Sequence, residues 1–342
     1  MKEGTVTMSD TFIHTLLADW DEERSLSREE AVAILDLPKE EMEDLISCAY
    51  ALRTKYKGKK VSVQLLTNVR SGNCSQNCAY CAQSCESHAP IEKYRRVSDE
   101  KLYGDNDLVD EKNLARHCIG LSGIKFTDAE IEDLAERIRI MKKKNTQICC
   151  SIGFLTEKQA KMLKEAGLDR INHNLNSSRS FYPEICSTHT YDQRVNNIKM
   201  LQGLGFEICS GGIIGMGETW EDRIDMAVSL FECGVDSIPI NSLMPIKGTP
   251  LENLERISEP DILRTVALFR YINPTADIRL GAGRALLTND GELAFESGVS
   301  ATITGNMLTT VACATIRSDK KMLEGIGRNV TPEYEKTQKI TK

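Results

Sequence analysis

Short hydrophobic segments alternate with longer amphipathic stretches along most of the chain. From about residue 60, runs of four to six residues rich in aliphatic and β-branched side chains recur, which is the pattern of buried strands. The stretches between them carry apolar residues at helical spacing. The predicted strands are 61–66, 116–120, 147–152, 170–175, 206–211, 236–240, 277–280 and 301–304.

Polar residue pairs mark where the helices between these strands begin. A serine or threonine that caps a helix is often followed three residues later by an acidic residue or glutamine that caps in return. Glycines such as Gly167 and Gly205 follow several helical stretches, as is typical of a helix end. The predicted capping pairs are Thr127 with Glu130, Thr156 with Gln159, Thr190 with Gln193, Thr219 with Asp222, and Ser258 with Asp261.

This alternation predicts an α/β fold with parallel strands. Eight strand–helix units fit a closed (β/α)8 barrel of the TIM type, which takes about 250 residues. An open doubly wound sheet is the alternative, but it usually carries a glycine-rich dinucleotide-binding turn after its first strand. Residues 66–74 contain no such motif, so we expect the closed barrel.

Helices are predicted before the barrel. Ser27 and Glu30 form a capping-box pair, and Gly58 ends the helical region. A second apolar stripe consists of Met42, Leu45, Ile46, Ala49 and Leu52. We expect three regions, namely an N-terminal helical extension (1–58), the barrel (59–328) and a loosely held polar tail (329–342).

Composition and charge narrow the functional classes. The chain has 342 residues, and 43 Lys plus Arg against 50 Asp plus Glu give a net charge of -7, with the basic residues scattered. Scattered basic residues argue against a nucleic-acid surface. No apolar run approaches the roughly 20 residues that span a bilayer, and the first residues lack a signal-peptide pattern. We expect a soluble cytoplasmic protein without membrane contact.

The twelve cysteines include a compact triplet directly after the first predicted strand. Cys74, Cys78 and Cys81 have C-x3-C-x2-C spacing, which suits three irons of a cubane iron–sulfur cluster and leaves the fourth iron open. A structural zinc site normally needs four ligands, and Cys85 or His88 is the candidate to complete one. Simple packing of three clustered cysteines is the remaining alternative. The iron–sulfur interpretation is favoured.

Other cysteines fall within predicted strands. Cys118, Cys209 and one of Cys149 and Cys150 point into the barrel if side chains alternate, as does Arg279. Each cysteine alone is more often a small buried apolar residue than a ligand. Together, three thiols and a guanidinium are able to hold a second, enclosed cluster.

The triplet, with Tyr80 between its last two cysteines, resembles the cluster motif of radical S-adenosylmethionine enzymes. Further segments are similar to the biotin synthase family, and this resemblance extends from about Val61 to Thr310. These segments are 116–120, 148–153, 172–176, 209–219 and 239–241.

The resemblance implies an enzyme that inserts sulfur into dethiobiotin to form biotin. It implies a 4Fe-4S cluster on Cys74, Cys78 and Cys81, with S-adenosylmethionine chelating the open iron and then yielding a 5'-deoxyadenosyl radical. The triplet and Arg279 are the residues expected to be catalytic.

The resemblance also implies an auxiliary cluster as sulfur donor, 2Fe-2S or larger. Its implied ligands are Cys118, Cys149, Cys209 and Arg279, with Arg284 as the alternative guanidinium. Whether additional cysteines join a larger cluster stays open, and the candidates are Cys85, Cys150 and Cys186.

Polar residues at strand ends are implied to hold the organic ligands. Asn174 and Asn176 resemble the ribose-binding pair of the family, Tyr80 lies where adenine would stack, and Ile213 belongs to a cofactor-binding glycine-rich segment. The resemblance implies four substrate-binding residues, Asn172, Asn241, Thr309 and Thr310. A lone Asn or Thr would otherwise be assigned to a turn or cap.

The implied partners are dethiobiotin, an electron donor such as flavodoxin or ferredoxin, the iron–sulfur assembly machinery, and a second copy of the chain in a homodimer. Two other functions remain as alternatives. One is another radical S-adenosylmethionine barrel enzyme, such as a hydrogenase maturase or an amino-acid mutase. The other is a non-catalytic iron–sulfur or zinc-binding protein.

Overall fold

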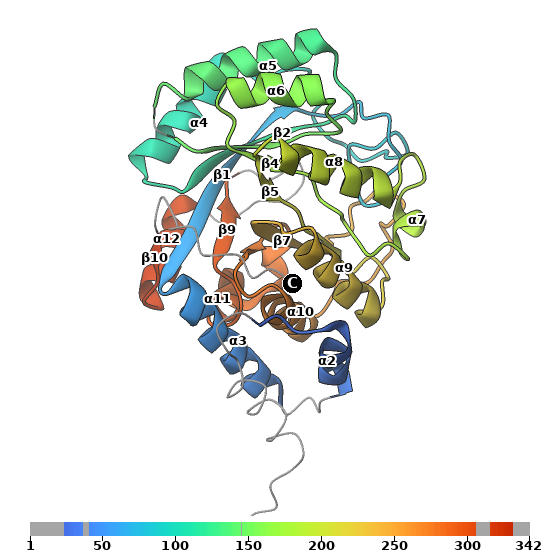
Figure 1. The fold of residues 1–342 in the computed structure, drawn as a ribbon, viewed down its shortest axis with the longest axis vertical. Coiled ribbons are helices and arrows are strands. Elements are labelled where there is room, and N and C mark those ends of the chain that lie inside the picture. The colour runs from blue at the N-terminus through green and yellow to red at the C-terminus, as the bar shows by residue number, and fades with distance from the viewer. Residues whose placement is uncertain (1–23, 37–40, 145, 306–314, 331–342) are drawn as a thin grey trace, which may run out of the picture.

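Eight parallel strands close into a barrel in the computed structural model, which describes residues 24–36, 41–144, 146–305 and 315–330. β1 pairs with β2 on one side and with β9 on the other, which closes the ring and excludes the open sheet. Figure 1 shows the strands at the centre and the helices around them. The barrel strands are β1 (Lys60–Arg70), β2 (Arg116–Leu121), β3 (Ile148–Ser151), β4 (Arg170–Asn172), β5 (Glu207–Cys209), β7 (Ser237–Ser242), β8 (Asp277–Leu280) and β9 (Ala301–Thr304).

The predicted strand 206–211 is interrupted and then continues as β6 (Gly212–Ile214). Cys209 of β5 is the Cα partner of Ser237, and Gly212 of β6 is that of Ile240, so both segments pair with β7 in one register. A Cβ at Gly212 would lie 2.7 Å from the backbone carbonyl oxygen of Asn176 and 2.1 Å from Met226 Sδ. Glycine is therefore required here for packing between strand and helix, a role that the sequence did not predict.

Helices cover the outside of the barrel. Capping boxes start α5, α6, α8 and α9 at the predicted threonines, and Ser258 caps α10, which confirms the predicted helix starts. The helix between β1 and β2, which begins after Ser98, was not predicted. The helices are α4 (Asp99–Glu111), α5 (Asp128–Met141), α6 (Glu157–Glu165), α7 (Tyr182–Ile185), α8 (Tyr191–Gly203), α9 (Trp220–Glu232), α10 (Glu259–Ile272), α11 (Glu292–Phe295) and α12 (Ile316–Gly325), with 3-10 turns at Arg284–Leu286 and Thr288–Gly291.

The N-terminal helices pack against the barrel. α2 (Arg28–Ala33) begins with the predicted Ser27–Glu30 capping box, a 3-10 turn (Ile34–Asp36) follows it, and α3 (Met42–Lys57) ends before Gly58. α2 contacts α9 and α3 contacts α10 (Figure 1). Buried Arg53 of α3 donates to the carbonyl oxygens of Val299 and Lys60, close to the starts of β9 and β1. The extension thus covers the amino-terminal end of the barrel.

The predicted polar tail begins with a short strand. β10 (Asn329–Val330) pairs in parallel with Lys60 and Val61 at the start of β1. The residues after Val330 lie outside the described part of the chain, as do Thr309 and Thr310.

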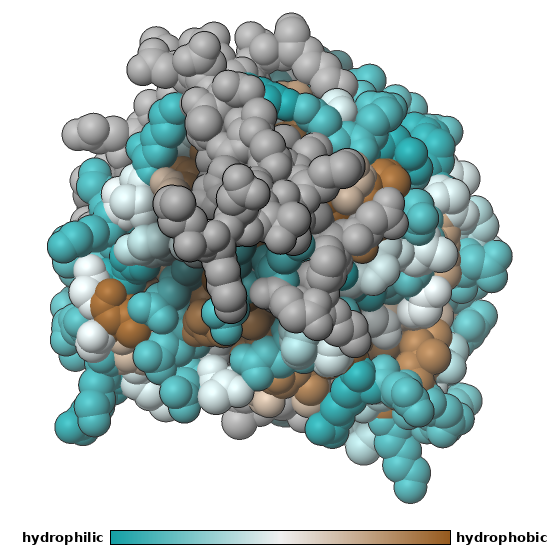
Figure 2. Space-filling view, turned by 90° about the horizontal axis from the view of Figure 1, so that it is seen from below, coloured by the Kyte–Doolittle hydropathy of each residue, from teal (hydrophilic) through white to brown (hydrophobic). Residues whose placement is uncertain are grey.

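None of the described helices combines the length and apolar character needed to cross a membrane. On the face shown in Figure 2, the coloured surface is mostly hydrophilic, and its hydrophobic atoms form separate small areas.

Candidate active site

The cysteine triplet lies in a loop that begins where β1 ends. The loop folds back on itself, because the Cys81 amide donates to the Cys78 carbonyl oxygen (3.0 Å) and the Cys74 amide to that of Gln83 (3.3 Å). Cys78 is buried, whereas Cys74 and Cys81 are half-buried. Parallel barrels place their chemistry at this carboxyl-terminal end of the strands.

The thiols of the triplet interact electrostatically. Burial and, to a smaller extent, the charge of Cys74 raise the pKa of Cys81 to about 11 against the effect of backbone hydrogen bonds. A hydrogen bond to Cys186 and burial raise the pKa of Cys78, to which the charge of Cys81 adds. Thiolates that raise one another's pKa in this way are stable only when a cation compensates their charge, and metal ions supply that compensation. The donor set fits an iron–sulfur cluster.

Cys186 and His189 are the neighbours of Cys78. Cys78 Sγ lies 3.8 Å from Cys186 Sγ, which lies 3.3 Å from His189 Nδ1. These three side chains are close enough together to suggest a metal site. However, Arg194 Nη2 donates to His189 Nε2 (2.7 Å), so the ring proton of the neutral imidazole lies on Nδ1. The single Nδ1 proton faces both Gln76 Oε1, at 2.9 Å from Nδ1, and Cys186 Sγ, and Cys78, Cys186 and His189 form a hydrogen-bond relay.

Cys85 and His88, the two candidates to complete a zinc site, are both exposed. The Cys85 amide donates to the Gln76 carbonyl oxygen (2.9 Å), which fixes the backbone of the loop. Buried Cys78 has Cys186, not Cys85, as its hydrogen-bond partner.

Arg194 of α8 is a buried cation beside the triplet that sequence reasoning missed. Its guanidinium donates to the Tyr182 hydroxyl (2.5 Å) and the Asn174 carbonyl oxygen (3.0 Å) as well as to His189. No carboxylate among the described residues pairs with it. Burial lowers the pKa of Arg194, but the charges of Tyr80, Tyr182 and Cys78 raise it on balance. A buried guanidinium with only neutral partners is suited to bind an anion.

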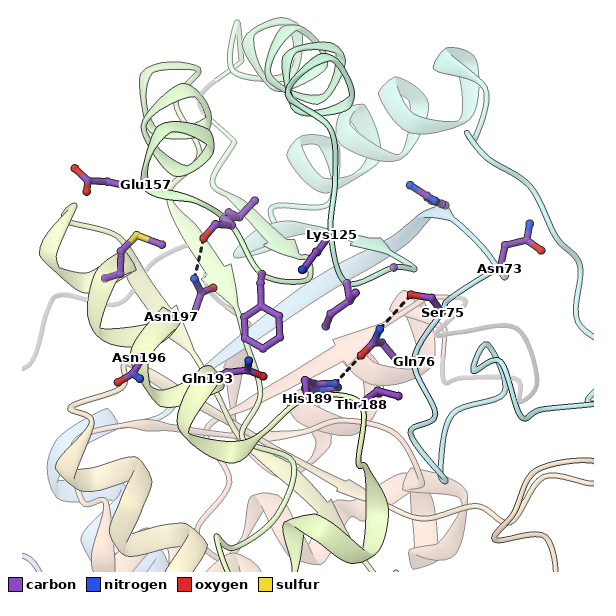
Figure 3. A pocket seen from close by; sticks show the side chains of 16 residues that line it. Asn73, Ser75, Gln76, Lys125, Glu157, Thr188, His189, Gln193, Asn196 and Asn197 are labelled. Carbon is purple, nitrogen blue, oxygen red and sulfur yellow. Dashed lines mark hydrogen bonds between the residues drawn. The ribbon is translucent and has the colours of Figure 1, made fainter.

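A polar pocket of about 790 Å³ opens next to the triplet loop. Gln76 and His189 form part of its wall and point toward each other, with Gln76 Oε1 2.9 Å from His189 Nδ1 (Figure 3). Lys125 and Glu157, from the loop after β2 and from α6, supply charge to its lining. The pocket thus leads from the barrel surface toward the relay beside Cys78.

A second group of thiols lies inside the barrel. Cys118, Cys149 and Cys209 are all buried, and they form a cluster separate from the main hydrophobic core. Cys118 and Cys149 are Cα partners across β2 and β3, and Cys209 pairs with Asn172 on β4. Cys150 instead packs in the outer hydrophobic core, which confirms that only one of the two adjacent cysteines points inward.

Buried donors surround this inner thiol group. Arg279 donates to the carbonyl oxygens of Thr302 (2.9 Å) and Ser62 (3.3 Å), and its Nη2 has no hydrogen-bond partner among the described residues. Cys118 Sγ donates to Gln64 Oε1 (2.9 Å), and in the described part of the chain Gln64 Nε2 is also unpaired. Unpaired buried donors cost free energy unless an acceptor binds them. This surplus of donors beside three thiols fits an anionic iron–sulfur cluster.

The charge of Arg279 acts on two of the three thiols. A hydrogen bond with Cys149 lowers the pKa of Cys118, and Arg279 lowers it further despite burial. Burial raises the pKa of Cys209, an effect that Arg279 partly offsets. Arg284, the alternative guanidinium, instead pairs with Asp319 (2.7 Å). The structure therefore brings Arg279, and not Arg284, to the inner thiol group.

The asparagines after β4 form a polar network above the inner thiols. Asn172 Nδ2 donates to Asn174 Oδ1 (2.9 Å), which also accepts from the Gly211 amide (3.1 Å). Asn241 bridges two strand ends, because its Nδ2 donates to the Gly212 carbonyl oxygen (3.0 Å) and its Oδ1 accepts from the Ala282 amide (2.9 Å). Both amide ends of Asn241 are therefore already engaged by the backbone.

The remaining predicted ligand-binding residues lie around this network. Ile213 of β6 is the Cα partner of Asn241, and its amide donates to the Asn176 carbonyl oxygen (2.9 Å). Asn176 has a positive φ of 71° and is buried, whereas Tyr80 is half-buried against the core. Burial raises the pKa of Tyr80 well above its usual value. Two predicted residues, Thr309 and Thr310, cannot be placed because they lie outside the described ranges.

The regions of the chain that match known protein families contain both thiol groups. Residues 68–230 match the Radical SAM superfamily, and residues 239–329 match the Biotin and Thiamin Synthesis associated domain. The biotin synthase of Brachyspira hyodysenteriae is 42% identical over 306 residues, which cover 89% of this chain and 91% of that protein. The biotin synthase of Clostridium beijerinckii is 45% identical over 300 residues, or 85% and 95% of the two chains.

The chain belongs to the biotin synthase family.

Solved structures support the same fold. Methylornithine synthase superposes with a TM-score of 0.79 and 19% identity, covering 96% of this chain and 98% of that chain. A FeFe-hydrogenase maturase from Carboxydothermus hydrogenoformans gives a TM-score of 0.77 and 18% identity, covering 94% and 79%. At these identities the likeness concerns the barrel fold alone, and the biotin synthase assignment rests on the curated relatives.

In this member of the biotin synthase family, the residues of the two thiol groups and Arg279 are distributed over the two matched domains. The radical S-adenosylmethionine domain contains the triplet and the three inner cysteines. Arg279 lies in the second matched domain, on β8. The inner thiol group is therefore completed from both domains across the barrel.

Proposed function

We propose that this chain forms biotin by radical insertion of sulfur into dethiobiotin, with S-adenosylmethionine as the radical source. The observation that carries this proposal is the pair of separate thiol groups in one barrel, one in the loop after β1 and one inside the lumen. When bound, a 4Fe-4S cluster supplies the electron that cleaves S-adenosylmethionine, and an auxiliary iron–sulfur cluster supplies the sulfur.

Cys74, Cys78 and Cys81 are proposed to hold the first cluster. Cys186 and His189 of the relay then link Cys78 to Arg194. We assign Arg194 to the carboxylate of S-adenosylmethionine, because this buried guanidinium lacks an anionic partner among the described residues and interacts with Cys78 and Tyr80. A charge-assisted hydrogen bond to a carboxylate is stronger than its present bonds to neutral acceptors.

Cys118, Cys149, Cys209 and Arg279 are proposed to hold the auxiliary cluster. All four are buried inside the barrel, which keeps water away from them. Exclusion of water protects a reactive carbon radical from side reactions. The free Nη2 of Arg279 and the free Nε2 of Gln64 provide donors for the sulfides.

The asparagine network is proposed to position the two organic ligands between the thiol groups. Asn174 and Asn176, with Ile213 and Tyr80, are assigned to the nucleoside of S-adenosylmethionine. Asn172, which bridges Ser151 and Asn174, is assigned to dethiobiotin. Two threonines outside the described ranges, Thr309 and Thr310, are assigned to its carboxylate.

Asn241 is assigned a narrower role than direct binding. Because both ends of its amide already bind the backbone, it positions the glycine-rich segment and the loop after β8. It offers only its remaining donor hydrogen and acceptor lone pair to a ligand.

The cellular context follows from the proposed chemistry. We assign the chain to the cytoplasm, with a flavodoxin or ferredoxin as electron donor and the iron–sulfur assembly machinery as supplier of both clusters. A homodimer and the division into an N-terminal helical extension (1–58), a barrel (59–328) and a tail (329–342) complete the proposal.

The test is an anaerobic reaction of the reconstituted, reduced protein with S-adenosylmethionine and dethiobiotin. Mass spectrometry should detect 5'-deoxyadenosine and biotin together. Deoxyadenosine without biotin would favour a different radical enzyme, and neither product from a cluster-loaded protein would favour a non-catalytic iron–sulfur protein.

A further inference from the structure

Arg170 brings a second guanidinium to the inner thiol group. It lies on β4, where it is the Cα partner of Cys149 on β3 and of Glu207 on β5. Registered partners in a parallel sheet point to the same face, so Arg170 shares the lumen with Cys149. The charges of Cys209 and Cys149 raise the pKa of Arg170, although burial opposes them.

The guanidinium of Arg170 is anchored on one side only. Nε and Nη2 donate to Glu207 Oε2 at 3.3 and 3.1 Å. Nη1 has no hydrogen-bond partner within the described ranges, although the residue is only 6% exposed. Leaving a charged donor unpaired in a buried site costs more than leaving a neutral one unpaired. An anchored guanidinium with one free, buried N–H edge is preorganised for an acceptor.

The charged residues at this end of the lumen also favour the binding of an anion. Glu207 is shared between Arg170 and Arg116, whose Nη2 donates to it at 2.7 Å. Asp277 pairs with Lys57 (3.3 Å), and the charges of Lys57, Arg279 and Arg170 lower its pKa against the effect of burial. Each of these two carboxylates is thus shared by more than one cation, and Arg270 also lowers the pKa of Asp277. Such an excess of buried positive charge is costly unless an anionic group binds there.

We infer that Arg170 is a further positioning residue of the auxiliary site, whose free Nη1 donates to a sulfide of the cluster held by Cys118, Cys149 and Cys209. This inference rests on the proposed auxiliary cluster. Arg279 and Arg170 then approach the cluster from β8 and β4, and Glu207 orients Arg170. The positive charge stabilises the reduced, more negative cluster and slows its loss from the barrel.

The test uses the full-length chain with alanine at Cys74, Cys78 and Cys81, so that bound iron reports only the inner site. This parent is compared with Arg170→Met, which removes the charge at similar length, and with Arg170→Lys, which keeps the charge. Arg284→Met is the matched control, because it likewise removes a buried guanidinium that pairs with a carboxylate, that of Asp319. The readouts are the reduction potential of the reconstituted cluster and the rate of iron release to a chelator.

We expect Arg170→Met to shift the reduction potential to a more negative value and to release iron faster, since loss of an outer-shell partner usually lowers metal affinity roughly 10-fold to 100-fold. Arg170→Lys should recover part of both effects, and Arg284→Met should match the parent. Equal potential and release rate in Arg170→Met and the parent would overturn the inference. A parent that binds no iron would instead overturn the proposed auxiliary cluster itself.

Discussion

Cys118 and Cys149 face each other as Cα partners on β2 and β3, and a hydrogen bond between their thiols lowers the pKa of Cys118. The next residue, Cys150, points out of the barrel into the hydrophobic core. Side-chain alternation along one strand therefore separates a proposed cluster ligand from a packing residue. Substitution of single cysteines can therefore test each thiol group, and the cysteines outside both groups, separately.

Replacement of Cys209 by alanine should remove the auxiliary cluster and spare the first. Cys209 belongs to the inner thiol group, apart from the triplet loop. We expect Cys209→Ala to lose biotin formation while cleavage of S-adenosylmethionine continues, as measured by iron and sulfide content and by both products. Cys150→Ala is the matched control, and should keep both clusters at a cost of about 1 kcal/mol in the free energy of unfolding. Loss of both clusters in Cys209→Ala would show that the sites are not separable.

Arg194→Met should weaken binding of S-adenosylmethionine. Removal of a charge-assisted hydrogen bond costs about 1.5–3 kcal/mol, which corresponds to roughly a 10-fold to 100-fold rise in Kd. The Kd is measured by equilibrium binding of S-adenosylmethionine to the cluster-loaded protein. Arg179→Met serves as the control, because Arg179 is exposed and pairs with Asp192. An unchanged Kd in Arg194→Met would refute the assignment of the carboxylate to this residue.

Gly212→Ala should strongly destabilise the barrel. The added Cβ would meet Met226 Sδ at 2.1 Å and the Asn176 carbonyl oxygen at 2.7 Å, and the second contact is with backbone. Such overpacking costs about 1–3 kcal/mol or more. Gly203→Ala, near the end of α8 with open space around it, should instead raise the free energy of unfolding by about 0.4–1 kcal/mol. Urea unfolding measures the free energy of unfolding of both variants. Similar values for Gly212→Ala and Gly203→Ala would show that Gly212 is not required for packing.

Stability should fall in mild acid because of His173. Burial lowers its pKa to about 3, and the nearby charges of Arg194 and His189 act in the same direction. An unfolded histidine titrates near 6.5, so between these values the unfolded chain binds the extra proton and stability is lost as the pH falls. Neutral His173 therefore contributes about 1.4 kcal/mol at pH 7.5 that is absent at pH 5.5.

The measurement is urea unfolding of the anaerobic holoenzyme at both pH values, for the parent and for His173→Phe. The variant cannot titrate at this position, so its loss of stability between the two pH values should be smaller by about 1.4 kcal/mol. An equal loss in both proteins would mean that His173 does not control the acid sensitivity.

The sequence alone predicts the barrel well, because its signals are local. Alternating strands and helices, capping pairs such as Thr127 with Glu130, and the spacing of the triplet each depend on a few neighbouring residues. Side-chain alternation also predicted that one of Cys149 and Cys150 points inward, and the structure shows which one. The interruption between β5 and β6 was missed because glycines in a strand do not reveal what packs against them.

The missed site residues depend on contacts between distant segments. The position of Arg194 beside Cys78 depends on how α8 packs next to the triplet loop, more than 100 residues away in the chain. For Arg170 a local signal existed, since it lies in phase with Asn172 and Asn174 on a predicted strand. That alternation predicts an inward-facing arginine, but its shared carboxylate and free Nη1 emerge only from the closed barrel.

The most direct test of the central claim is to trace the sulfur. The auxiliary site is reconstituted with sulfide labelled with a heavy sulfur isotope, unbound sulfide is removed, and a single anaerobic turnover is run with S-adenosylmethionine and dethiobiotin. If the thiols of Cys118, Cys149 and Cys209 hold the sulfur source, the biotin formed should carry the heavy isotope, and Cys209→Ala should form none. Unlabelled biotin, from a protein shown to contain the labelled cluster, would contradict the account.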